Sequence, residues 1–166
     1  YYGFIPSQDY YPDVFVGRFS AETVSHVNTM VNRTISYERY PDIDDGSWYI
    51  EGAGFASNEG PGDDGEYDNE HMDIIRQKLL DYNYVDIEQV YDPSGTIAEG
   101  EVAINDGLSI INYTGHGSDV SFATTGFDNN DINDLTNEQM FPFIFSVACV
   151  NGNFTSQTCF AETWLR

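Results

Sequence analysis

The feature that most constrains the fold is a long apolar run near the end of the chain, FPFIFSVACVNG at residues 141–152. The run is rich in Phe, Ile and Val, and Asn-Gly closes it. A continuous apolar run of this kind predicts a fully buried central strand whose last residues enter a loop at the edge of the sheet. Cys149 lies at this carboxyl end, so the run is expected to present a thiol at the sheet edge.

A second stretch, LSIINYTGHG at residues 108–117, has the same pattern, because an apolar strand ends in His116 between two glycines. Functional groups in open α/β sheets gather outside the carboxyl ends of parallel strands, so His116 and Cys149 are predicted to form a Cys/His dyad. Taken singly, an isolated Cys is more often a small buried hydrophobe, and a His beside Gly is more often a turn residue. The shared context favours the dyad.

Strands and helices alternate along the rest of the chain. Further strands are expected at residues 14–19, 48–57 and 84–91, and helices at 20–39, from 70 onward, at 96–105 and around 131–135. This alternation predicts an α/β fold with a mainly parallel sheet and helices on both faces. In the first helix, Ser20 is the expected N-cap. Its expected apolar stripe is Val24, Val27, Val31 and Ile35.

Length and charge limit the kinds of protein to which the chain can belong. Its 166 residues suit one domain, and the formal net charge of −22 with only six Lys plus Arg argues against nucleic-acid binding. Divalent cations and cationic ligands are the expected partners.

No run reaches the roughly 18 apolar residues of a membrane-spanning helix, so membrane insertion is not expected. The abrupt ends at Tyr1 and Arg166 suggest a fragment of a longer protein, truncated at both ends.

Two acidic segments are candidates for binding calcium. Asp9, Tyr11 and Asp13 alternate near the start of the chain, where two carboxylates and the Tyr11 carbonyl are expected to converge on a structural Ca²⁺. The alternative is a solvated acidic turn. The second segment, NEGPGDDGEYDNEH at residues 58–71, is expected to be solvated or calcium-bound, or to carry a carboxylate that reads the substrate. His71, at its end, is expected to face solvent.

The chain has two cysteines, Cys149 and Cys159, which permit one disulfide without requiring it. A nucleophilic Cys149 must remain reduced, so the disulfide and the dyad are mutually exclusive.

Five motifs together resemble the catalytic domain of the gingipains, cysteine endopeptidases secreted by Bacteroidetes. The motifs are FVGRFS, NEGPGDDGEYDNEH, INYTGHGSD, FPFIFSVACVNGNF and TCFAETWLR, which are spread over nearly the whole chain. The resemblance is greatest to the arginine-specific members. It implies a caspase-like three-layer α/β/α sandwich with a mainly parallel sheet, formed by residues 1–166 as a single peptidase domain.

The resemblance also implies roles for particular residues. Cys149 corresponds to the nucleophile and His116 to the base, and Glu59 corresponds to the acid that orients the histidine. Backbone N–H groups of Gly117 and Cys149 are candidates for the oxyanion hole, because donors at this position can stabilise the charge that develops on the scissile carbonyl. Thr114, in the same motif as His116, is expected to contact the substrate.

Asp68 corresponds to the acid at the base of the arginine pocket. The chain has two fewer residues between Glu59 and Asp68 than the arginine-specific members are expected to have, so Asp63 or Asp64 is the alternative pocket acid. A purely structural alternative is that Asp68 caps the helix expected to begin near Glu70.

The function that these features predict is a secreted or cell-surface cysteine endopeptidase that cleaves proteins or peptides after a basic residue, with Arg as the expected one. Structural calcium is expected, and no organic cofactor. One alternative is a gingipain-like sortase of the type IX secretion system, which removes a sorting domain and joins the new end to a lipopolysaccharide amine. Another is a calcium-stabilised binding module whose dyad is vestigial.

Overall fold

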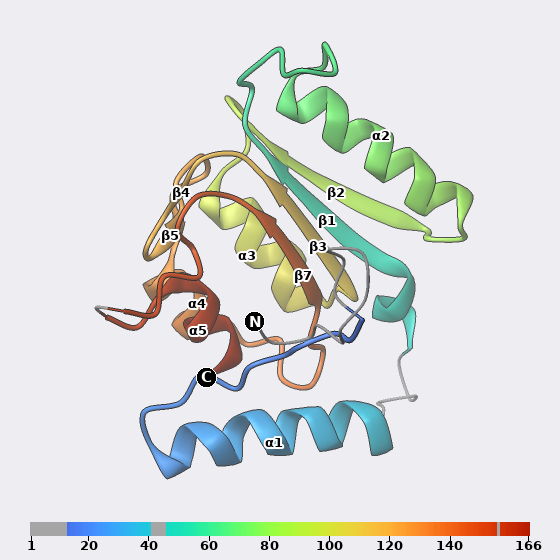
Figure 1. Ribbon diagram of the computed structural model, residues 1–166. Helices are drawn as coiled ribbons and strands as arrows, with labels where there is room; N and C mark the ends of the chain where they lie inside the picture. The colour runs from blue at the N-terminus through green and yellow to red at the C-terminus, as the bar shows by residue number, and fades with distance from the viewer. Residues whose placement is uncertain (1–12, 41–45, 156) are drawn as a thin grey trace.

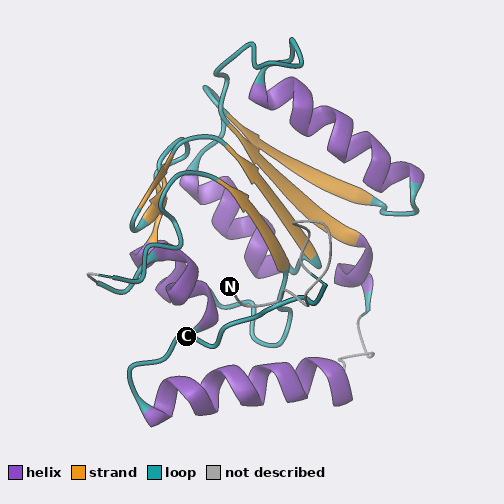
Figure 2. Cartoon of the chain, in the orientation of Figure 1, coloured by secondary structure: helices purple, strands orange, loops and turns teal. Residues whose placement is uncertain are grey.

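The centre of the molecule is a four-stranded parallel sheet, seen in a computed structural model that describes residues 13–40, 46–155 and 157–166 (Figures 1 and 2). The strands lie in the order β2-β1-β3-β7. Their bounds are Glu51–Ala56 for β1, Asp86–Tyr91 for β2, Ile110–Thr114 for β3 and Phe143–Val147 for β7. All three pairings between them are parallel, as the alternation of strands and helices predicted.

Helices α2 (Asp68–Asp81) and α3 (Ile97–Asp106) cover opposite faces of this sheet (Figure 1). Successive residues of a strand point to opposite faces. On β1, a Cβ on Gly54 would lie 2.7 Å from Met72 of α2, whereas the next residue, Phe55, packs against Gly100 of α3. The absence of side chains at Gly54 and Gly100 therefore lets both helices approach the sheet closely. The predicted three-layer α/β/α arrangement is confirmed.

Local sequence signals set the bounds of α3. The Thr96 hydroxyl accepts a hydrogen bond from the Glu99 backbone at 3.2 Å, and the Glu99 carboxylate accepts one from the Thr96 backbone at 2.8 Å. This reciprocal capping box satisfies donors that the first turn leaves free. At the other end, Gly107 has φ +104°, a conformation that ends the helix and that side chains disfavour. The expected helix at residues 96–105 is confirmed to within one residue.

The first helix, α1 (Val24–Arg39), begins later than expected. Its N-cap is Thr23, whose hydroxyl accepts a hydrogen bond from the His26 backbone at 3.2 Å. The prediction of Ser20 as the cap is wrong, because the Ser20 hydroxyl instead donates to the carboxylate of Glu162, far along the chain. The Ser20 hydroxyl therefore forms a long-range tertiary hydrogen bond in place of the helix cap that local sequence rules predicted.

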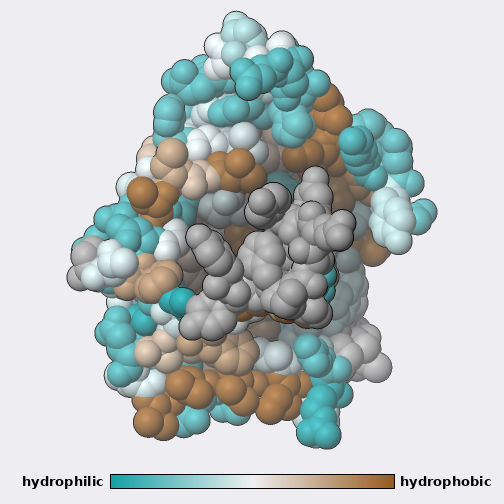
Figure 3. All heavy atoms as spheres, in the orientation of Figure 1, coloured by the Kyte–Doolittle hydropathy of each residue, from teal (hydrophilic) through white to brown (hydrophobic). Residues whose placement is uncertain are grey.

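The apolar stripe predicted for α1 is also wrong. Val24, Val27 and Ile35 are 76%, 42% and 41% exposed, whereas Met30 is 2% exposed. Hydrophobic residues of this face form the brown row along the lower edge of Figure 3, where α1 lies. The helix contacts its neighbours through another side, on which Met30 is buried and Tyr37 packs edge-to-face on Trp48 with ring centres 6.1 Å apart.

Two expectations about strands are wrong for the described residues. Residues 14–19 form no strand, and Val14, Phe15 and Val16 are all more than half exposed. The strand from the apolar run, β7, is not a buried central strand, because within the described chain its one strand neighbour is β3. Phe143 and Val147 are accordingly each 65% exposed. Hydrophobicity identified β7 correctly as a strand but misplaced it within the sheet.

A smaller antiparallel sheet follows β3, which the sequence did not predict. Its strands lie in the order β4-β5-β6. They are Gly117–Ser118, Ser121–Phe122 and Phe127–Asp128. The remaining elements are η1 (Ser47–Ile50), α4 (Asn129–Asp134) and α5 (Phe160–Leu165). Phe122 anchors this sheet to the core. Its ring stacks on that of Tyr113 with ring centres 3.8 Å apart, and it packs edge-to-face on Phe160 with ring centres 4.6 Å apart.

Both partners of a buried ion pair at the end of α5 also form hydrogen bonds with Ser20, in the segment that precedes α1. Oε1 of Glu162 lies 3.0 Å from a guanidinium nitrogen of Arg166, and both side chains are less than a tenth exposed. The other carboxylate oxygen of Glu162, Oε2, accepts a hydrogen bond from the Cys159 backbone N–H at 2.9 Å. Burial by itself would raise the pKa of Glu162, but hydrogen bonds from Ser20 and from Cys159, together with the charge of Arg166, lower it below its ordinary value.

We therefore expect Glu162 to contribute to acid denaturation. A carboxyl whose pKa is lowered in the folded state stabilises the protein above its unfolded pKa, and this contribution is lost as the pH falls through the folded pKa. Glu162→Gln should cost about 3 kcal/mol at neutral pH, because it removes the buried charge that pairs with the buried Arg166 and leaves it only the exposed carboxylate of Glu22. Melting temperatures measured between about pH 6 and pH 3 should fall less steeply for this variant than for the wild type.

The control for this prediction is Glu22→Gln. Glu22 also pairs with Arg166, at 3.2 Å, but its side chain is 63% exposed. Exposed pairs contribute about 1 kcal/mol or less. Equal effects of the two substitutions, or a Glu162→Gln variant with the wild-type pH dependence, would contradict the assignment to the buried carboxylate.

Candidate active site

The pairing register of β3 and β7 brings His116 and Cys149 to one end of the sheet. Thr114 pairs with Val147 at the carboxyl ends of the two strands. His116 and Cys149 each follow their paired residue by two positions. The two strand-end loops are in direct contact, since a Cβ on Gly117 would overlap with the Cys149 carbonyl oxygen and lie 2.9 Å from the Ala148 side chain. The sequence-predicted dyad residues are thus neighbours in the fold.

The backbone of His116 is held from several directions. Its carbonyl oxygen accepts hydrogen bonds from the Tyr113 hydroxyl and, at 2.9 Å, from the Ala123 backbone. Its N–H donates to the Thr124 hydroxyl at 3.1 Å. Burial raises the pKa of Tyr113, so this hydroxyl keeps its proton and remains a donor. The His116 side chain itself is 70% exposed, so a rigid loop presents a solvent-accessible imidazole.

Glu59 comes from the other neighbour of β3. It follows β1, and its carboxylate lies 3.9 Å from Nε2 of His116, with both side chains mostly exposed. Three consecutive strands of the sheet, β1, β3 and β7, therefore place an acid, an imidazole and a thiol at the same end. Glu59 lies where the resemblance predicted an acid that orients His116, although the tips of the two side chains are at the outer limit of an ion pair.

Asp68 is held at the start of α2 by two contacts. The hydroxyl of Ser57 donates to one Asp68 oxygen, and the Asp68 backbone donates to the Glu59 carbonyl at 2.9 Å. The alternative that Asp68 caps the helix is wrong, because α2 begins at Asp68 itself and its N-cap is Tyr67. Ser57 is only 2% exposed, so it fixes the carboxylate from within the protein.

Both residues predicted to bind substrate, Asp68 and Thr114, line one cavity of about 340 Å³. The alternative pocket acids, Asp63 and Asp64, line it as well. The complete lining is Gly62, Asp63, Asp64, Glu66, Asp68, His71 and Thr114. Four carboxylates and a histidine around a cavity of this size favour a cationic occupant. Thr114 also belongs to the strand that leads to His116, which places the cavity beside the dyad.

A candidate metal site lies in the same acidic loop. Nδ1 of His71 is 2.8 Å from the Glu66 carboxylate and 3.6 Å from that of Asp64. One ligand atom from each of the three residues lies within 4.8 Å of the others, which suits a single divalent cation. Of the predicted calcium ligands, Asp9 and Tyr11 lie outside the described residues, and Asp13 is exposed.

The two cysteines are both free, so the disulfide alternative is not supported. Cys149 is exposed, whereas Cys159 is 1% exposed. Burial raises the pKa of the Cys159 thiol, which therefore stays protonated and is a poor nucleophile. The exposed thiol is the one beside His116.

Sequence reasoning missed the residues that support the site, notably Ser57, Tyr113 and Thr124. Ser57 gave a weak signal, because it is a polar residue directly after the apolar strand β1. Tyr113 and Thr124 gave no usable signal, because their contacts with His116 depend on the unpredicted antiparallel sheet.

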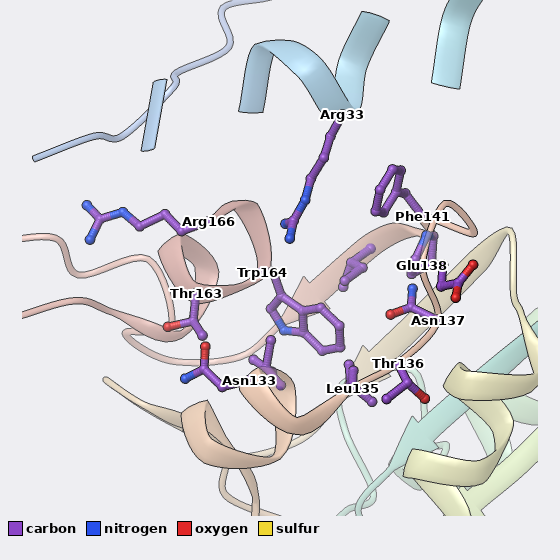
Figure 4. Close-up of a pocket in the computed structure, with 13 residues that line it drawn as sticks. Arg33, Asn133, Leu135, Thr136, Asn137, Glu138, Phe141, Thr163, Trp164 and Arg166 are labelled. Atoms are coloured by element: carbon purple, nitrogen blue, oxygen red, sulfur yellow. The ribbon is translucent and has the colours of Figure 1, made fainter. Parts of the chain in front are cut away.

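A larger cavity of about 510 Å³ lies away from these residues, between α1, α5 and the segment before β7 (Figure 4). Arg33 extends into it from α1, and its guanidinium lies 5.4 Å from the centre of the Phe141 ring. Trp164 and Arg166 line it from the α5 side. It contains none of the predicted site residues, so size does not identify the candidate active site.

Comparison with known proteins gives a consistent result. The family model described as peptidase family C25 matches residues 1–166. Gingipain R2 of Porphyromonas gingivalis is 43% identical over 168 residues, covering 99% of this chain and 23% of that protein. Lys-gingipain of the same species is 24% identical over 161 residues, covering 95% of this chain and 9% of that protein. The chain thus spans less than about a quarter of each of these relatives.

Solved structures show the same similarity. A crystal structure of the Arg-specific cysteine proteinase gingipain R matches with a TM-score of 0.94 at 42% identity, covering 99% of this chain and 39% of that chain. A complex of the pro- and mature domains of RgpB from Porphyromonas gingivalis also gives a TM-score of 0.94 at 42% identity, covering 99% of this chain and 40% of that one.

Proposed function

The chain belongs to peptidase family C25, and from this premise we propose that it carries the catalytic dyad and the arginine pocket of a cysteine endopeptidase similar to gingipain R. The observation that carries the proposal is the register of β3 and β7, which pairs Thr114 with Val147 and so sets His116 beside Cys149. The higher identity to gingipain R2 than to Lys-gingipain, 43% against 24%, supports Arg rather than Lys as the preferred residue before the cut.

The proposed reaction follows from the chemistry of these groups. The thiolate of Cys149 attacks the scissile carbonyl, and the new oxyanion accepts hydrogen bonds from the backbone N–H groups of Gly117 and Cys149. The protonated imidazole of His116 then gives its proton to the leaving amine. Water, activated by the neutral imidazole, hydrolyses the thioester and restores the thiol. Glu59 orients His116 during both steps.

Substrate recognition is assigned to the acidic cavity. One Asp68 oxygen accepts from Ser57, and the carboxylate faces a cavity whose other acids are exposed or half-exposed. A fixed carboxylate can pair with the planar guanidinium through two parallel hydrogen bonds, whereas an ammonium ion offers a point charge. We assign proteins and peptides with Arg before the cut as substrates, with Thr114 in contact with the same side chain.

The proposal is tested by covalent labelling of the full-length protein. A probe with Arg next to a thiol-reactive warhead should label Cys149, and a matched Lys probe should label it more slowly. Labelling at another residue, or no labelling by either probe, would contradict the proposed function. Transfer of the cleaved peptide to an added amine in preference to water would instead support the sortase alternative.

We place this activity outside the cell or at the cell surface, as the resemblance to secreted endopeptidases implies. Within the described residues, no helix is both long and apolar enough to cross a membrane. A secretion assay that finds the mature protein only in the cytoplasm would contradict this localisation.

Asp64, Glu66 and His71 are the described residues that we propose to hold a structural divalent cation. The two carboxylates fit calcium, and the imidazole nitrogen also suits zinc. The ion would relieve repulsion within the acidic loop beside the pocket. An excess of chelator should therefore lower the melting temperature by about 5 to 10 °C, the shift expected for losing about 2.7 kcal/mol of ligand stabilisation.

Re-addition of Ca²⁺ or Zn²⁺ separately identifies which ion restores stability. In an Asp64→Asn/Glu66→Gln variant the chelator should have a smaller effect. An unchanged melting temperature in excess chelator would contradict any bound metal. A chelator effect that this variant retains in full would move the metal to another site, such as the one predicted at Asp9, Tyr11 and Asp13.

A further inference from the structure

Asn151, two residues after Cys149, has a fully bonded side chain. It is 4% exposed. Its amide nitrogen donates to the carbonyl oxygens of Ser118 and Ser121, at 2.7 and 2.8 Å. Its amide oxygen accepts from the Ser146 hydroxyl at 2.9 Å. Both amide N–H donors are thus used, which is the full donor capacity of the group.

These three bonds connect segments that are distant in sequence. Ser118 and Ser121 pair with each other across the β4–β5 hairpin, which follows His116 directly. Ser146 lies in β7, the strand that leads to Cys149. One side chain therefore joins the loop of the proposed nucleophile, the strand before it and the hairpin after the proposed base.

The backbone between Cys149 and Asn151 is strained. Val150 has φ +55°, in the left-handed region that a β-branched residue rarely adopts. Such a conformation persists only where the surrounding structure enforces it. Here the carbonyl oxygen of Val150 accepts a hydrogen bond from the Asn153 backbone N–H at 2.9 Å. The carbonyl oxygen of Asn151 accepts one from the Ala161 backbone N–H at 3.0 Å. The side chain of Asn151 adds the connection to the histidine loop.

The two loops also have little freedom to shift independently. A Cβ on Gly117 would overlap with the Cys149 carbonyl oxygen and lie 3.1 Å from the Asn151 amide oxygen. Displacement of the hairpin would therefore change the distance between thiol and imidazole. Misplacement of reacting groups by about 1 Å can lower a rate by roughly a hundredfold.

We infer that Asn151 is a positioning residue that sets the alignment of Cys149 with His116 by fastening the nucleophile loop to the β4–β5 hairpin. This inference rests on the proposed function of the dyad. Asn151 itself touches neither substrate nor reacting atoms. A merely structural Asn151 would change the stability of the protein without changing the reactivity of the folded molecules.

The test compares Asn151→Asp with the wild type. Aspartate has the shape of asparagine and can still accept from Ser146, but it cannot donate to the two carbonyls as a carboxylate. We expect kcat for an Arg peptide to fall roughly a hundredfold per folded molecule, with KM nearly unchanged, because the pocket residues are untouched. Asn129→Ala is the matched control, because it removes a side chain that donates to the Thr158 carbonyl at 3.2 Å and keeps the backbone N–H that donates to the Val120 carbonyl of the hairpin at 3.0 Å.

A second readout does not need peptidase activity. The rate at which iodoacetamide alkylates Cys149, followed against pH by mass spectrometry, reports how the imidazole affects the thiolate. Asn151→Asp should change this profile, and Asn129→Ala should not. If the wild type fails to cleave peptides, the proposed function fails, but an altered profile in Ser146→Ala, which removes a bond to Asn151 without adding a charge, would still support positioning by Asn151.

Ser146→Ala keeps the inference testable if Asn151→Asp does not fold. It removes only the bond to the Asn151 oxygen, from an exposed position, so it should fold and lower kcat by roughly threefold to tenfold. The inference is overturned if Asn151→Asp, or Ser146→Ala in its place, retains wild-type kcat and the wild-type alkylation profile per folded molecule, whatever the change in melting temperature.

Discussion

Cys149→Ala is expected to abolish peptide hydrolysis while the fold remains intact. The substitution removes one exposed sulfur atom and no part of the buried core. Loss of the nucleophile from a catalytic unit typically lowers kcat by more than about a thousandfold. Initial rates on an Arg peptide, together with circular dichroism and a melting curve for the same sample, measure both parts of the prediction.

The matched control is Cys159→Ala. Cys159 is buried and free, so its replacement should lower stability by about 1 kcal/mol without changing the rate per folded molecule. Turnover that survives in Cys149→Ala would make Cys149 structural. A large loss of activity per folded molecule in Cys159→Ala would contradict the purely structural role of this buried thiol.

Asp68→Asn is expected to reduce cleavage after Arg by roughly two orders of magnitude or more. Removing one partner of a desolvated charge pair costs on the order of 2 to 5 kcal/mol, because the substrate guanidinium is then buried without its partner. About 1.4 kcal/mol corresponds to a tenfold change in rate. Asparagine has the same shape and can still accept from Ser57, so the architecture of the pocket should survive.

Specificity constants for paired Arg and Lys peptides measure this effect. Asp63→Asn provides a control from the same cavity, and it should leave the Arg preference largely unchanged. An unchanged Arg preference in Asp68→Asn would contradict the pocket assignment. A large loss of Arg preference in Asp63→Asn, or in Asp64→Asn, would identify that residue as the pocket acid in place of Asp68.

The sequence alone determined the features that depend on neighbouring residues. The ends of α3 follow from Thr96, Glu99 and Gly107, which act within a few positions of one another. The apolar runs identified β3 and β7 as strands, and the parallel sheet followed from the alternation of elements. Because the carboxyl ends of parallel strands meet at one sheet edge, the same pattern predicts that His116 and Cys149 lie close together.

The acidic loop was only partly accessible from the sequence. The resemblance assigned Glu59 and Asp68 their roles, and the structure places the first near His116 and the second against Ser57. Which carboxylates face the cavity depends on how the glycines and proline fold the loop. Neither charge pattern nor periodicity describes that path.

Only the tertiary structure decided which surfaces are buried. Hydrophobicity predicted a buried β7 and a buried Val24 to Ile35 stripe on α1, yet both are largely exposed in the described chain, because burial depends on which elements pack against each face. The supporting bonds of Asn151 and Glu162 likewise join residues about 30 and 140 positions apart. No local pattern encodes such contacts, since they exist only once the sheet has brought distant segments together.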